Sequence, residues 1–210
     1  MKRSGFEAMS PYRYPFYILF HPIDGFQELR ANKKGSLFIA TLIICCWMLV
    51  EVLHRSFTDF DMNAFDPENT SLLRVALITV VMYLMACVSN WCFCTLLDGK
   101  GKLKDILVVG AYSLLPYVIV RFITIFLSHL LVGSEQMLLT YCVVISEVWT
   151  AFMIIAGLQE IHEYSLRKVL FSLFLTVVGI IIILFLALAF VQLFEKLYFF
   201  FATIILELRY

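Results

Sequence analysis

The chain has 210 residues, of which 62% are hydrophobic and only 15% are charged, and its formal net charge is zero. Its mean hydropathy is +0.91, whereas soluble domains are about half apolar and about a quarter charged. These values exclude the soluble classes and indicate a helical membrane protein. No stretch of soluble composition is long enough to form a second domain of about 50 residues, so we expect a single membrane domain.

The first 35 residues combine six basic side chains with several aromatic ones, which is typical of a segment in the lipid headgroup region. Within this arm, Pro22 can start a short helix from about 22 to 31 that ends near Asn32 and Gly35. A flexible basic tail is the alternative. No basic stretch leads directly into an apolar run with a cleavage site, so we expect no cleaved signal peptide.

Five apolar segments follow, each long enough to cross the hydrocarbon core as a helix at about 1.5 Å per residue. The predicted spans are 36–53, 72–97, 106–131, 137–159 and 169–193, and together they predict an all-α bundle of five transmembrane helices over residues 36–193. Residues 194–210 form an apolar tail that we expect to continue the fifth helix and bend along the outer surface. A sixth span beginning near Leu193 is the alternative.

Basic residues are distributed unevenly between the two predicted sides. The arm, residues 98–105 and residues 160–168 carry eleven Lys and Arg residues, against four on the other side, where residues 54–71 form an acidic loop. Because basic loops are retained in the cytoplasm, we expect the amino terminus inside and the carboxyl terminus outside.

Two charged residues, Arg121 and Glu147, lie within predicted spans, where an unpaired charge is costly. Each is ten residues from the loop that joins the third and fourth spans, so antiparallel helices would place them at similar depth. We predict a direct ion pair. It could lock two helices together, or its charges could line a polar cavity.

The segment from Gly110 to Pro116 predicts a kink in the third span. Proline cannot donate to the carbonyl of Tyr112, four residues before it, and Gly110 permits close approach of a neighbouring helix. Ser113 or another helix could satisfy the freed carbonyl. The kink could serve packing alone, or it could form a hinge or binding crevice.

A candidate partner surface lies on the predicted cytoplasmic side. Gln159 and His162 share one side of a helix, and Tyr164, Lys100 and Lys102 lie in segments on the same side. The sequence offers no second ligand cluster for a metal and no motif of a catalytic nucleophile. We therefore expect no enzyme, no metal and no other cofactor.

With these residues in view, the chain resembles the Ypt-interacting-protein (YIP-domain) membrane family, especially its compact bacterial members. The resemblance is carried by four segments, His21-Pro-Ile-Asp-Gly-Phe, Leu97-Asp-Gly-Lys-Gly-Lys-Leu-Lys, Ala111-Tyr-Ser-Leu-Leu-Pro116 and Gln159-Glu-Ile-His-Glu-Tyr-Ser. It implies five helices, a cytoplasmic amino terminus and a role in vesicle trafficking and membrane shaping in eukaryotes, or beside transport systems in bacteria. The Asp-Leu-Tyr-Gly-Pro motif of the eukaryotic branch is absent, so we expect no Rab GTPase partner.

We therefore predict a non-catalytic integral-membrane adaptor or accessory subunit that binds membrane lipids and another integral membrane protein, such as a transport system. The alternative is a small transporter or channel that uses the region of Arg121 and Glu147. We expect the protein in the bacterial cytoplasmic membrane, with the ER or Golgi membrane as the alternative, and we expect no nucleic-acid partner.

Overall fold

The computed structural model describes residues 13–32, 35–57, 71–131 and 135–209, and the described residues form eight α-helices. Five segments are long and apolar enough to cross a membrane, with α5 and α6 together forming one of them. This confirms the predicted all-α membrane fold with five candidate spans. Residues 1–12 of the predicted arm and most of the predicted acidic loop lie outside the described residues. The helices are α1 (Tyr14–Phe20), α2 (Pro22–Asn32), α3 (Leu37–Phe57), α4 (Leu72–Leu96), α5 (Leu103–Ser113), α6 (Leu115–Ser128), α7 (Gln136–His162) and α8 (Leu166–Arg209).

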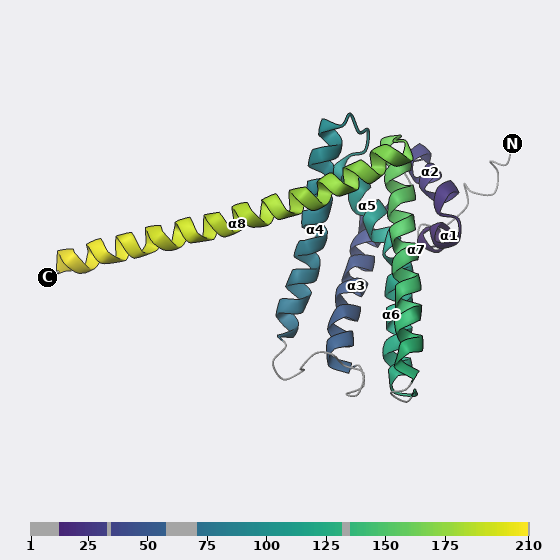
Figure 1. Cartoon of the computed structure of the whole chain (residues 1–210), viewed down its shortest axis with the longest axis horizontal. Helices are drawn as coiled ribbons and strands as arrows, with labels where there is room; N and C mark the ends of the chain where they lie inside the picture. The colour runs from purple at the N-terminus through teal and green to yellow at the C-terminus, as the bar shows by residue number, and fades with distance from the viewer. Residues whose placement is uncertain (1–12, 33–34, 58–70, 132–134, 210) are drawn as a thin grey trace.

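Helices α3, α4, α5–α6 and α7 lie side by side and form a bundle (Figure 1). At one end of this bundle, which we call the head end, α2, the α4–α5 loop at 97–102 and the α7–α8 joint at 163–165 come together. At the opposite end, which we call the far end, α3 and α6 finish and α4 and α7 begin. The two ends of the bundle are therefore formed by different loops and present different side chains.

The amino-terminal arm packs into the protein. Helix α2 matches the predicted helix at 22–31, whereas the seven-residue α1 was not predicted. Ile18 and Phe26 are fully buried, and the Tyr14 hydroxyl donates to the carbonyl of Gly25 at 2.7 Å. One face of the arm therefore completes the protein core, and its location in the headgroup region stays a prediction. Its outward side still exposes Phe16 and Phe20.

The third span is divided at Leu114, inside the segment where the sequence predicts a kink. Helix α5 ends at Ser113 and α6 begins at Leu115, with Pro116 in the first turn of α6. Proline is tolerated there because the first helical residues have no intrahelical acceptor for their N–H groups. The hydroxyl of Ser113 is buried without a hydrogen-bond partner in the described structure, so it does not satisfy the freed carbonyl of Tyr112. Gly110, where a Cβ would lie 3.0 Å from the Tyr83 hydroxyl oxygen, permits the close contact with α4.

Helix α8 has 44 residues and continues unbroken through the predicted tail at 194–209. At about 1.5 Å per residue it is ~66 Å long, about twice the thickness of a bilayer core. Instead of returning beside α7, it crosses α4 and extends away from the bundle (Figure 1). Every residue from 184 to 201 is exposed. The side on which the carboxyl terminus lies stays a prediction.

Small side chains explain where α8 crosses α4. A Cβ on Gly179 would lie 2.1 Å from Ser89 Oγ and 2.5 Å from the Phe93 ring, so only glycine fits. Close by, Ser89 Oγ donates to the Thr176 carbonyl at 2.8 Å, and Asn90 Nδ2 donates to Thr176 Oγ1 at 2.9 Å. Close backbone approach combined with interhelical hydrogen bonds is the usual means of joining helices in lipid. This contact fixes the proximal part of α8 on α4.

Candidate functional site

At the head end, the α4–α5 loop lies directly on His162. The imidazole is buried, and its Nδ1 accepts a hydrogen bond from the backbone N–H of Gly101 at 3.3 Å. A Cβ on Gly99 would lie 2.4 Å from this Nδ1 and 2.6 Å from the Tyr164 hydroxyl oxygen. The loop can close on the ring only because residue 99 has no side chain.

Tyr164 also holds the α4–α5 loop in place. Its hydroxyl donates to the carbonyls of Cys94 and Leu97 at 3.0 and 3.1 Å, at the end of α4 where helix carbonyls lack intrahelical donors. Its ring stacks on His162 with centroids 5.2 Å apart, and Lys168 Nζ lies 4.3 Å from the ring centroid. Burial raises the pKa of Tyr164 to about 12, so the phenol is neutral and donates at physiological pH.

Glu163 joins three elements at the head end. It caps α7 in the left-handed conformation, with φ of 56°. Its carboxylate forms ion pairs with Arg30 of α2 and with Lys100 of the loop. Arg30 also donates to the carbonyl of Glu160 at 3.3 Å. The arm, the loop and the α7–α8 joint are therefore held as one unit.

The predicted partner surface is divided by this arrangement. His162 and Tyr164 are buried and Gln159 is half-buried, and the backbone carbonyl of Gln159 accepts from the backbone N–H of Tyr164 at 3.1 Å. The prediction that the His162 and Tyr164 side chains face a partner must be corrected, because the loop covers them. Lys100 and Lys102 are exposed. The sequence feature that could have indicated this burial is the pair of glycines at 99 and 101, which let the loop backbone approach the His162 ring.

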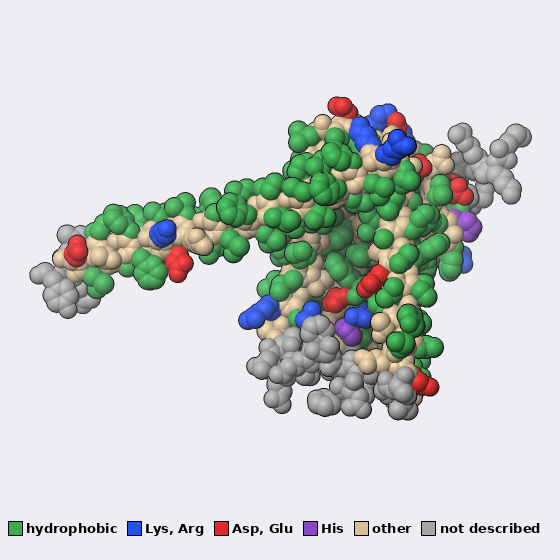
Figure 2. All heavy atoms as spheres, viewed as in Figure 1, with side chains coloured by type: hydrophobic (Ala, Val, Ile, Leu, Met, Phe, Trp, Pro, Cys, Tyr) green, Lys and Arg blue, Asp and Glu red, His purple; other side chains and the backbone are tan. Residues whose placement is uncertain are grey.

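We call the exposed lysines of this region, Lys100, Lys102 and Lys104, the lysine surface. All three are carried by the α4–α5 loop or by the first turn of α5. They present positive charge at the head end, where Figure 2 shows a group of blue side chains. Arg167 and Lys168, in the first turn of α8, also belong to this end. The arrangement can bind acidic groups.

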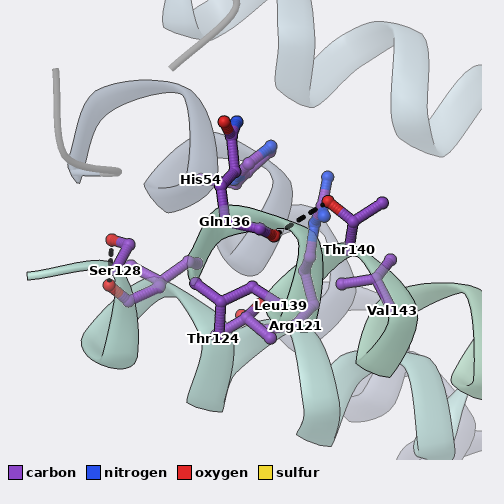
Figure 3. A pocket seen from close by; sticks show the side chains of 9 residues that line it. His54, Arg121, Thr124, Ser128, Gln136, Leu139, Thr140 and Val143 are labelled. Atoms are coloured by element: carbon purple, nitrogen blue, oxygen red, sulfur yellow. Dashed lines mark hydrogen bonds between the residues drawn. The ribbon is translucent and has the colours of Figure 1, made fainter. Parts of the chain in front are cut away.

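A second polar region lies within the bundle, where Arg121 and Glu147 line different cavities. Arg121 lines a cavity of about 80 Å³ near the far end together with His54, Thr124 and Gln136, and Figure 3 shows these side chains converging from α3, α6 and α7. Glu147 lines a groove of about 340 Å³ together with Glu51 and Tyr117. The two cavities share no lining residue.

The predicted ion pair between Arg121 and Glu147 is not among those formed by the described residues. The helix ends explain this difference. Arg121 precedes the end of α6 by about two turns, whereas Glu147 follows the start of α7 by about three turns, so their depths differ by ~6 Å. Tyr117 lies between them, donating to Glu51 Oε1 at 2.6 Å, with the guanidinium carbon of Arg121 5.9 Å from its ring centroid.

The groove beside Glu147 contains polar groups without partners, and we call it the acidic groove. Trp47 Nε1 and Thr150 Oγ1 are buried there with no hydrogen-bond partner in the described structure. Glu147 is exposed, and within the described residues it forms neither a hydrogen bond nor an ion pair. Figure 2 shows acidic and basic side chains in the hollow of the bundle below α8. The groove is therefore suited to accept a cationic group.

Comparison with known proteins identifies the domain type. The sequence matches the Yip1 domain over residues 16–189, from α1 into the middle of α8. No curated protein and no solved structure matches the chain. The match includes both the lysine surface and the acidic groove, and it ends before residues 190–209, which we call the distal part of α8.

Proposed function

Because the chain belongs to the Yip1 domain family of membrane proteins, we propose that it is a non-catalytic adaptor that binds another integral membrane protein. Its partner would contact the lysine surface with an acidic segment close to the membrane. We place this surface on the cytoplasmic side, since basic loops are retained there, and the bacterial cytoplasmic membrane is the compartment we favour.

The observation that carries this proposal is that buried side chains form hydrogen bonds to the exposed basic loop and fix its backbone. His162 and Tyr164 hold the loop in place, so the backbone that carries Lys100 and Lys102 is already ordered. Binding to an ordered loop avoids much of the entropy cost of fixing a flexible one. Exposed lysines also attract acidic partners over a distance of about one Debye length.

Reversing charge on the lysine surface tests the proposal. The full chain carrying Lys102→Glu and Lys104→Glu would be crosslinked in native membranes, purified and analysed by mass spectrometry for membrane proteins that remain bound. We expect the main partner to fall at least ~fivefold, because acidic residues would now repel its acidic segment. Arg74→Glu, on an exposed residue near the far end, is the matched control and should leave recovery unchanged. Equal partner recovery from all three proteins would refute the proposed surface.

A small transporter is the second candidate, and it is favoured by the charges of Arg121 and Glu147 within the spans. Intramembrane charges often mark ion or substrate pathways. Purified protein in lipid vesicles should then conduct or carry a cation, and Glu147→Gln should abolish this flux. Vesicles that show no flux above that of empty vesicles would exclude this candidate for the cations tested.

A further inference from the structure

The acidic groove and the distal part of α8 carry opposite charges that have no partners within the described residues. Glu147 lies in the groove, while Lys196 follows Glu195 on an exposed stretch of α8 whose other side chains are mostly apolar. Neither residue forms a hydrogen bond or ion pair with another described residue. An unpaired charge at membrane depth is costly. Glu195 does not face Lys196, because adjacent residues of a helix point in different directions, so Glu147 and Lys196 each call for an opposite charge from elsewhere.

The path of α8 keeps these two residues apart within one copy. The helix is fixed on α4 at Gly179, and Lys196 lies ~26 Å further along it. Figure 1 shows this distal part leading away from the bundle, at a height between the bundle's two ends. It therefore extends through the layer that a neighbouring bundle would occupy, and ~26 Å is enough to reach one.

We propose that the acidic groove receives Lys196 of a second copy of this chain, and that the exchange is reciprocal. The ammonium group has three donors. The carboxylates of Glu147 and Glu51 and the unpartnered hydroxyl of Thr150 supply acceptors in the groove. The exposed residues of α8 around Lys196, from 184 to 201, are mostly apolar and are covered by the partner's bundle. This dimer is independent of the lysine surface.

The test uses full-length protein with two different affinity tags, coexpressed and purified in lipid nanodiscs large enough for two copies. Glu147→Lys alone places like charges in both contacts of a dimer, and so does Lys196→Glu alone. Each variant should recover its own second tag at least ~tenfold less well than the unaltered chain. Copies carrying Glu147→Lys mixed with copies carrying Lys196→Glu should associate, because both reciprocal contacts again join opposite charges.

Matched variants exclude general effects of charge. Glu135→Lys, at the exposed start of α7, and Glu195→Lys, next to Lys196 on α8, should leave association near that of the unaltered chain. Thermal unfolding of every variant identifies any that fail to fold, and recovery of association in the mixture shows that both single variants are folded. Mixed copies that associate no better than either variant alone would overturn the proposal. It would also be overturned if the Glu147→Lys, Lys196→Glu double variant were stabilised as a monomer, because the pair would then form within one copy.

Discussion

The head end and the acidic groove contain similar polar residues, but these residues differ in whether they find hydrogen-bond and ion-pair partners. At the head end, Glu163 pairs with Arg30 and Lys100, and the Tyr164 hydroxyl donates to two carbonyls. In the groove, Glu147 has no ion pair within the described residues, and Thr150 Oγ1 has no hydrogen bond there. The head end is thus completed within one chain, whereas the groove leaves polar groups that, in our proposal, a second copy completes. Variants in each region test this difference.

The largest expected loss comes from the contact that fixes α8. Gly179→Leu would force a side chain into Ser89 and Phe93, and overpacking of this kind typically costs about 1–3 kcal/mol or more. We expect the free energy of unfolding, measured by SDS titration, to fall by about 3 kcal/mol. Ala187→Leu, a large side chain on the exposed part of α8, should change it by less than about 0.5 kcal/mol. Equal effects would mean that the α4–α8 contact contributes little.

The next loss concerns the support under the head-end loop. His162→Ala removes a buried ring and the acceptor for the Gly101 N–H, which should cost about 2 kcal/mol. His162→Phe restores volume without the acceptor and should lose only about 1 kcal/mol. Hydrogen exchange of residues 98–102 should rise in both variants. Unchanged exchange would show that the loop is held by other contacts.

A smaller loss is expected at Tyr164, together with a distinct dependence on pH. Tyr164→Phe removes two hydrogen bonds to backbone carbonyls and should cost about 1 kcal/mol at neutral pH. The pKa of this phenol is raised from 10.0 to about 12, so between these values the folded protein holds a proton that the unfolded chain has lost. Stability should therefore fall as pH rises from 10 to 12. SDS titrations across this range should show a shallower fall in Tyr164→Phe, and parallel curves would contradict the assignment.

The smallest expected effect is the coupling between Arg121 and Glu147. Because these residues line separate cavities, the effects of Arg121→Ala and Glu147→Ala on unfolding should add to within about 0.5 kcal/mol. A double-mutant cycle measures this directly. Coupling above about 1 kcal/mol would restore the direct ion pair predicted from the sequence.

Hydropathy and proline chemistry predicted the five candidate spans, the helix at 22–31 and the segment in which the third span breaks. These features depend on composition and local backbone limits, which a single sequence contains. The distance between Arg121 and Glu147 depends on where α6 ends, and this is at Ser128 instead of the predicted residue 131. That difference of about one turn was enough to change their relative depth. The burial of His162 depends on a loop 61 residues away in sequence, so it required the tertiary structure.

The crossing at Gly179 also makes α8 a long helix that is held at one point and, in the described part of the chain, is free beyond it. Beyond that residue the helix extends ~45 Å to Arg209, so each degree of tilt on α4 moves the far end by ~0.8 Å. A small rearrangement between Ser89 and Thr176 would therefore displace the carboxyl-terminal end by several ångströms. Changes in bilayer thickness, which tilt apolar helices, would be magnified at that end in the same way.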